Sequence, residues 1–239
     1  MRHRWRRMAA GLLMFGISFG YVEAAVVVYL RTIYEPTRLR VHPKQAVGDL
    51  FPLMTREELR ATAPERLRLG RVEVVREAAT LLMLSGVGLV AAGRWGHWLP
   101  AFAIAFGAWD LSYYVFLKIL VGWPASLFAW DVLFLIPVPW AAPVLAPAIV
   151  SVSIIAMGLV ALRWSVRMSV VHCIALAMGG FLIVLSFVWD SSNIIAGGWP
   201  HPFAWAVFVP GELLGVGAFF HAVRIAALSE AAYSDSIRA

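Results

Sequence analysis

Residues 8–30 read MAAGLLMFGISFGYVEAAVVVYL, and Glu23 is the only charged side chain in this run. A transmembrane α-helix needs about 20 consecutive, predominantly apolar residues, so the run is long enough to cross a bilayer. The arginine-rich residues 2–7 in front of it imitate a secretory signal. The length of the run and the charge of Glu23 favour a retained membrane span over a cleaved leader.

The composition of the whole chain extends this interpretation. Of 239 residues, 61% are hydrophobic and 14% are charged, whereas soluble domains average about 45–50% apolar and about 25% charged residues. The formal net charge is +6, but the basic residues lie at predicted helix ends and in one loop, which favours membrane topology over nucleic-acid binding. A single cysteine, Cys173, excludes an internal disulfide and a Cys-rich metal site.

Further apolar runs predict the remaining spans. Five of them follow, at 73–93, 98–120, 143–163, 169–190 and 202–225. The polar stretch 31–71, rich in Arg, Glu and Pro, is predicted to be an extracytoplasmic loop, and 226–239 a short cytoplasmic tail. We therefore expect an all-α, polytopic transmembrane helix bundle of about six spans, with residues 1–239 forming one integral membrane domain.

The stretch 126–164 is too long for one straight span, because at about 1.5 Å per residue it reaches nearly 60 Å against a hydrocarbon core of about 30 Å. Prolines at positions 137, 139, 143 and 147 interrupt it. We predict that 126–141 is a Pro-broken re-entrant or interfacial segment on the outer side. The alternative is that 126–141 crosses fully, which gives seven spans and an external C-terminus.

The basic residues also predict an orientation. With six spans, the arginines at one side of the membrane are those at positions 2, 4, 6, 7, 94, 163, 167 and 224. The loops 121–125 and 191–201 on the other side contain no Lys or Arg, so both termini are expected to be cytoplasmic. The exception is 31–71, with nine basic and five acidic residues, although long loops follow the rule less closely.

Carboxylates occur in or beside nearly every apolar run. They are Glu23, Glu77, Asp110, Asp131, Asp190 and Glu212. A charge at the centre of a bilayer costs roughly 2.5–3.5 kcal/mol even on the lenient insertion scale, and such residues usually face a bundle interior. We predict an outward-facing acidic site. Its residues are Glu23, Glu77, Asp110, Asp131 and Glu212, with Arg76 as the counter-charge. Asp190 is interpreted as a wetted helix end.

Cofactor chemistry is not assigned by the sequence. It contains no closely spaced His/Glu metal motif and no Gly-rich phosphate loop, so no metal site is predicted. His172 and His221 are expected at similar depth on consecutive antiparallel spans, which leaves an axial haem pair open beside the simpler interpretation as helix-end histidines.

Four stretches carry a resemblance to known sequences. They are GYVEAA at 20–25, REAAT at 76–80, WD at 109–110, and Asp131 followed by FLIPVPW at 134–140. Over most of residues 15–150 the chain resembles an uncharacterised family of bacterial polytopic membrane proteins. The resemblance implies the bacterial cytoplasmic (inner) membrane; it implies no activity, cofactor or site residue.

Three functions fit these observations. The leading hypothesis is binding or transport of a cation, a proton or a small polar ligand in the acidic site. The second is a non-catalytic subunit of a larger membrane complex, with 31–71 and the aromatic rims as contact surfaces. The third is an intramembrane enzyme acting on a lipid or isoprenoid substrate, in which paired carboxylates serve as acid and base. The expected partners are membrane lipid and either other membrane proteins or a second copy of the chain.

Overall fold

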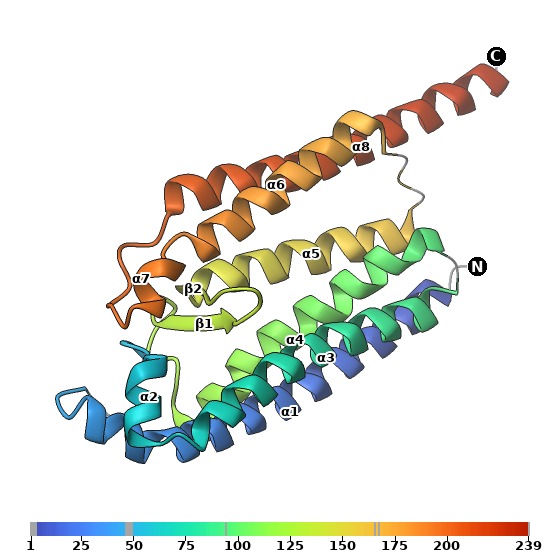
Figure 1. The fold of residues 1–239 in the computed structure, drawn as a ribbon. Helices are drawn as coiled ribbons and strands as arrows, with labels where there is room; N and C mark the ends of the chain where they lie inside the picture. Colours follow the sequence, from blue (N-terminus) through green and yellow to red (C-terminus); the bar gives the residue numbers. More distant parts are fainter. Residues whose placement is uncertain (1–3, 46–49, 94, 165, 167, 239) are drawn as a thin grey trace.

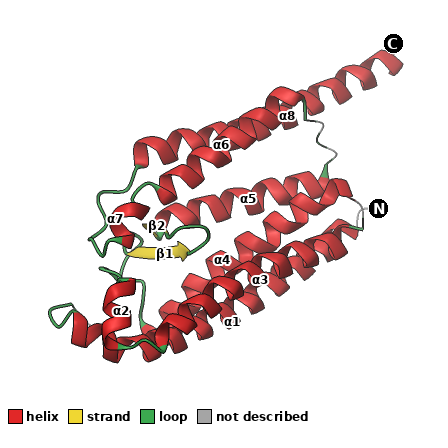
Figure 2. Cartoon of the chain, in the orientation of Figure 1, coloured by secondary structure: helices red, strands yellow, loops and turns green. Residues whose placement is uncertain are grey.

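Long helices dominate residues 4–45, 50–93, 95–164, 166 and 168–238, which the computed structural model describes (Figure 2). Along the chain the elements are α1 Arg4–Val41, α2 Arg56–Thr62, α3 Arg66–Ala92, the 3-10 turn η1 Trp95–His97, α4 Trp98–Val121, β1 Trp130–Phe134, β2 Trp140–Pro143, α5 Leu145–Arg163, α6 Val170–Val188, α7 Ser191–Ile195 and α8 Trp205–Arg238.

Six helical segments of the described chain are long and apolar enough to cross a membrane. They are Arg4–Val41, Arg66–Ala92, Trp95–Val121, Leu145–Arg163, Val170–Ile195 and Trp205–Ser229. The predicted polytopic helix bundle is therefore confirmed, and the chain is a multi-pass membrane protein. The N-terminal end of α1 and the C-terminal end of α8 lie at the end of the bundle opposite α2, α7 and the β-hairpin (Figure 1).

The polar stretch 31–71 is mostly helical, which corrects the prediction of a loop. Helix α1 continues through it to Val41 with Pro36 inside the helix, so its 38 residues extend for about 57 Å, well beyond a hydrocarbon core of about 30 Å. The arginine-rich sequence contains no glycine before Pro36 that would end the helix earlier. At the other terminus, α8 continues to Arg238, so residues 226–238 of the predicted tail prolong the last helix, and residue 239 lies outside the described residues.

The segment 126–141, predicted to be re-entrant or interfacial, contains strand β1 and the start of β2, which form a two-stranded antiparallel β-hairpin. Strand β1 pairs with β2 from Trp130 opposite Pro143 to Phe134 opposite Trp140, with an irregular register after Val132. Pro137 lies in the connecting turn, where its missing N–H interrupts no strand pairing. Pro137 and Pro139 lie between the two strands, whereas Pro143 ends β2 and Pro147 lies in the first turn of α5.

The hairpin joins two groups of helices. One group packs around Leu12, Leu84 and Ile104 and consists of α1, α3, α4 and α5. The other is the antiparallel pair α6 and α8, which packs along its length (Figure 1). Ala142 of β2 packs against Phe187 of α6 and Phe208 of α8. The hairpin therefore lies where the two groups meet.

Some of the arginines that predict the orientation of the chain in the membrane lie outside the described residues. Arg2, Arg94 and Arg167, three of the arginines used to predict cytoplasmic termini, are outside the described residues. Arg163 ends α5 at the same end of the bundle as the start of α1 (Figure 1).

Candidate functional site

An ion pair connects α1 to α3. Arg76 Nη1 donates to Glu23 Oε2 at 2.5 Å, and the same guanidinium binds both oxygens of Glu73 at 3.0 and 2.5 Å. Nη1 also lies 3.3 Å from the Thr80 hydroxyl. The Glu23 side chain is 8% exposed and that of Arg76 25% exposed. Two carboxylates therefore share one guanidinium in a largely enclosed position.

Close contact between α1 and α4 sets the direction in which Glu23 faces. A Cβ on Gly16 would lie 2.6 Å from the carbonyl oxygen of Ala105, and a Cβ on Gly20 would lie 2.7 Å from that of Trp109. Only glycine permits this approach, which is the common use of small residues between membrane helices. Glu23 follows Gly20 by less than one turn, which places it beside this contact.

Glu77 connects α3 to the turn of the hairpin. Its Oε2 accepts the backbone N–H of Leu135 at 2.8 Å, and the residue is 7% exposed. Its sequence neighbour Arg76 binds Glu23 and Glu73, and no ion pair to Glu77 occurs among the described side chains. Its hydrogen-bond partner is therefore a neutral amide.

Asp110 connects α4 to α5 in a similar way. Its Oδ2 accepts a hydrogen bond from the Ser151 hydroxyl at 2.8 Å, and Ser151 is 1% exposed. Within the described part of the chain, no Lys, Arg or His forms an ion pair with Asp110. This second carboxyl is likewise held by a neutral donor.

Asp131 of β1 is the most completely buried of the predicted site residues that the structure brings together, at 3% exposure. Its Oδ2 has no hydrogen-bond partner among the described groups. Burial raises the pKa of the Asp131 carboxyl to about 7, against the opposing effects of the Arg31 guanidinium and the Tyr114 hydroxyl, which favour the charged form. An unsatisfied buried oxygen of this kind is costly unless something binds it.

Arg31 of α1 is a functional candidate that sequence analysis missed. Its Nε and Nη2 atoms are buried and unpaired in the described structure, and its guanidinium carbon lies 4.3 Å from the centre of the Trp123 ring. The residue was assigned to the loop 31–71. The lack of Gly and Pro between Leu30 and Pro36 is the signal that places Arg31 on the same helix as Glu23.

The Tyr113 hydroxyl links these groups. The charges of four of them act on it electrostatically, namely Asp131, Arg31, Glu23 and Asp110. We call this set the interior cluster; it consists of Glu23, Arg31, Glu73, Arg76, Glu77, Asp110, Tyr113, Tyr114 and Asp131. The interior cluster contains five carboxyl groups and two guanidinium groups from α1, α3, α4 and β1, so negative charge is in excess if all are ionised.

Glu212 is placed apart from the other predicted site residues. It lies on α8, next to Gly211, whose position packs against Gly179 of α6. Its Oε1 is buried without a partner in the described structure. The structure does not bring it beside Glu23, because α8 packs on α6 and α1 packs on α4.

Two other polar residues stabilise the ends of helices. Asp190 accepts from the side chain of Asn193 at 3.0 Å and from the backbone N–H of His201 at 2.8 Å, which closes the loop after α6. Lys118 donates to the carbonyl oxygens of Gly122 and Pro124 at 3.0 and 2.8 Å. Both contacts are structural.

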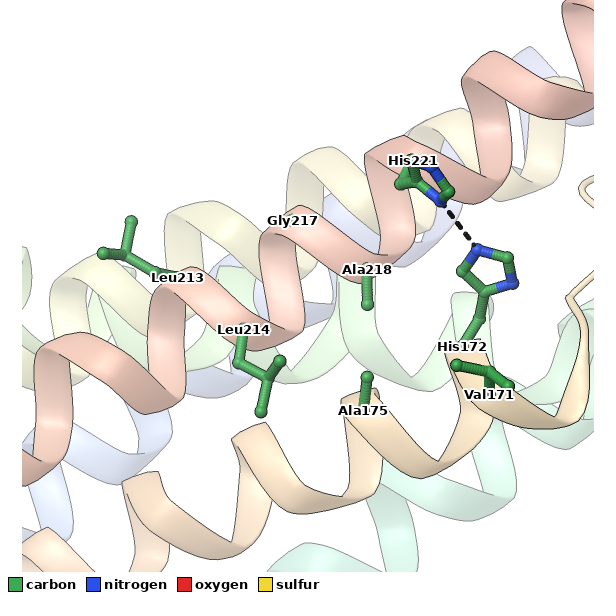
Figure 3. Close-up of a pocket in the computed structure, with 8 residues that line it drawn as sticks. All are labelled: Val171, His172, Ala175, Leu213, Leu214, Gly217, Ala218 and His221. Atoms are coloured by element: carbon green, nitrogen blue, oxygen red, sulfur yellow. Dashed lines mark hydrogen bonds between the residues drawn. The ribbon is translucent and has the colours of Figure 1, made fainter.

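His172 and His221 face each other between α6 and α8 (Figure 3). Nε2 of His172 lies 3.0 Å from Nδ1 of His221, and Ser169 holds the other ring nitrogen of His172 at 2.7 Å. An axial haem pair would hold iron between its ring nitrogens, whereas these two are in direct contact. Elsewhere too, the described residues contain no group of three His, Cys, Asp or Glu side chains suited to a metal ion.

Comparison with known proteins identifies no related protein. No protein-family model, no curated protein and no solved structure matches the chain. The functional argument therefore rests on the interior cluster itself.

Proposed function

We propose that the interior cluster binds a cation, a proton or a small polar ligand and passes it toward the bundle end that carries α2. One observation supports this proposal: the buried carboxyls Glu77 and Asp131 and the half-buried carboxyl Asp110 have no ion-pair partner among the described residues. Like charges held close together in a poorly solvated place cannot all stay ionised without compensation. Bound protons or a bound cation provide that compensation, and their exchange is the function.

The same proposal includes the location of the protein. Both termini lie in the cytoplasm, the α2 end faces outward, and the chain resides in a bacterial cytoplasmic membrane. The support is the arginine content at the other end of the bundle, including Arg4, Arg163 and Arg224.

The test is ion movement into proteoliposomes. Purified protein is reconstituted with an internal pH dye, a pH difference is imposed, and proton entry is followed with and without Na⁺ or K⁺. Asp110→Asn and Glu77→Gln are expected to lower the rate about tenfold or more, because each removes one exchangeable charge at nearly constant size. Glu57→Gln on α2 is the matched control, since Glu57 is exposed.

Two outcomes contradict the proposal. One is a wild-type flux no greater than that of empty liposomes, for protons and for both cations. The other is an unchanged flux in both cluster variants, provided that each variant inserts and elutes as the wild type does.

A non-catalytic subunit is the second candidate, and the Arg76 contacts favour it. Arg76 is bound by Glu23 and Glu73 in an arrangement that a purely structural ion pair also produces. This function predicts that neutral substitution of both partners of the ion pair, Arg76→Gln with Glu23→Gln, leaves assembly intact. A stable partner protein recovered at fixed ratio, lost on deletion of residues 42–55, would favour it over transport.

A further inference from the structure

Arg31 presents an unused binding edge. Its Nε and Nη2 atoms form the side of the guanidinium that binds carboxylate or phosphate through two parallel hydrogen bonds. Both atoms are buried and unpaired in the described structure. Trp123 covers the guanidinium at 4.3 Å from its ring centre, and this contact with the face of the guanidinium uses neither of the two edge atoms.

Whereas two edge atoms of Arg31 lack a hydrogen-bond acceptor, one carboxyl oxygen of Asp131 lacks a donor among the described groups. Its Oδ2 is a buried acceptor without a described donor. Arg31 is the charged group that most strongly favours ionisation of this carboxyl, yet the two side chains form no ion pair within 4.0 Å. A donor edge and an acceptor oxygen of opposite charge therefore lie near each other, and neither satisfies the other.

We propose that Arg31 and Asp131 together bind a small zwitterion, with its carboxylate or phosphate on the Arg31 edge and its primary ammonium group on Asp131 Oδ2. The two protein charges cancel, so a ligand of zero net charge with separated poles fits them without leaving a buried charge unpaired. This inference rests on the proposed function and names the class of its ligand.

Two sources supply this chemistry. One is a free amino acid reaching the site from the α2 end. The other is the ethanolamine phosphate headgroup of a membrane lipid, since Arg31 lies at the end of the apolar run 8–30, where headgroups are expected. The shared recognition is an anion beside a primary ammonium group.

Glycine is the probe for the free ligand, and the protein is placed in phosphatidylglycerol nanodiscs that contain no ammonium headgroup. Calorimetry compares glycine with acetate, methylammonium and acetamide, which carry the anion, the cation or neither charge. Glycine is expected to bind about tenfold or more tightly than each of the three, about 1.4 kcal/mol or more in binding free energy. Equal binding of acetamide would overturn the charge argument.

Variants locate the binding. Arg31→Lys keeps the charge but removes the two-pronged edge, and Asp131→Asn keeps the shape but removes the negative pole, so each should weaken glycine binding about tenfold. Arg40→Gln, at the exposed end of the same helix, should change nothing. Unchanged glycine binding in both Arg31→Lys and Asp131→Asn would refute the assignment.

One measurement needs no variant, and so covers the case in which a variant fails to fold. Asp131 must be ionised to hold an ammonium group, so glycine affinity should rise at least about tenfold between roughly pH 5 and pH 8. The groups facing Asp131 are Arg31 of α1 and Asp110, Tyr113 and Tyr114 of α4. A flat affinity over this range would overturn the proposal.

Native mass spectrometry tests the lipid source. In nanodiscs that also contain phosphatidylethanolamine, one such lipid retained per chain, and lost in Arg31→Lys and Asp131→Asn, would support a headgroup site even without glycine binding. If neither glycine nor this lipid binds, the inference is wrong. In that case a proton or cation flux that still depends on Glu77 and Asp110 leaves the proposed function standing, and its loss as well means that both fail.

Discussion

Arg76 of α3 donates to Glu23 of α1 at 2.5 Å across 53 positions of sequence, and it binds Glu73 one turn away on its own helix. The contact is both the longest-range ion pair of the interior cluster and the place where two carboxylates depend on a single cation. Removing the charge of Arg76 therefore leaves two carboxylates unpaired, whereas removing the charge of Glu23 leaves Arg76 paired with Glu73.

Arg76→Gln should destabilise the protein more than Glu23→Gln. Loss of the guanidinium leaves Glu23 and Glu73 unpaired in an enclosed place, whereas loss of the Glu23 charge leaves Arg76 bound to Glu73. Breaking a buried pair costs up to about 3–5 kcal/mol, and partial exposure of Arg76 reduces that figure. The check is thermal unfolding in one detergent, with Arg71→Gln, an exposed arginine of the same helix, as the control. Equal losses in the two variants would contradict the shared-cation arrangement.

Gly20→Ala should separate α1 from α4. The added Cβ would lie 2.7 Å from the Trp109 carbonyl oxygen and would also overlap the Ser112 hydroxyl. The backbone cannot move aside, so a cost of about 1–3 kcal/mol is expected from overpacking.

Gly11→Ala on the same helix is the matched control for that variant. A Cβ at Gly11 meets nothing within 4 Å, so this change should leave stability the same or raise it by up to about 1 kcal/mol through helix propensity. Thermal unfolding compares the two. Similar melting temperatures for both variants would mean that the α1–α4 contact is looser than described.

The membrane spans could be predicted because their signal is local. Residues 98–120 and 143–163 were predicted as spans, and the structure has Trp98–Val121 and Leu145–Arg163. The hairpin could not be predicted in the same way. Prolines at 137 and 139 exclude a helix. Strand β1, however, forms only by pairing with β2, and short stretches of sequence do not determine such pairing.

The candidate site was predictable along each helix but not across helices. The sequence predicts Arg76 as the counter-charge of the acidic site, and the structure pairs Arg76 with Glu23. The sequence also predicts Glu212 as a residue of this site, and the structure does not bring it beside Arg76 and Glu23. Depth is set by position along a helix, whereas neighbours are set by which helices pack, and α8 packs on α6.

Glu77→Leu should loosen the hairpin turn. Glu77 accepts the Leu135 N–H at 2.8 Å, and leucine leaves that buried amide without an acceptor, at a cost of about 1–3 kcal/mol. Glu77→Gln keeps an acceptor oxygen and should cost less. Hydrogen exchange is the measurement: peptides that contain Leu135 should exchange faster in Glu77→Leu than in Glu77→Gln, while peptides from α6 stay unchanged. Identical exchange in the two variants would show that the contact does not hold the turn.

Asp131→Asn should stabilise the protein more at pH 8 than at pH 5. Burial raises the pKa of Asp131 to about 7, whereas an aspartate in an unfolded chain has a pKa of about 3.9. Between these values the folded state binds the extra proton, so the free energy of unfolding of the wild type falls as the pH rises. Asparagine resembles the neutral carboxyl at every pH and avoids that loss. The melting temperature of the variant minus that of the wild type should therefore grow by several degrees from pH 5 to pH 8, since about 1 kcal/mol corresponds to about 2–4 °C for a chain of this size. Glu57→Gln, at an exposed position, should show no such growth. A constant difference across the range would mean that Asp131 is paired or solvated when the protein is folded, and that its Oδ2 is not available to a ligand.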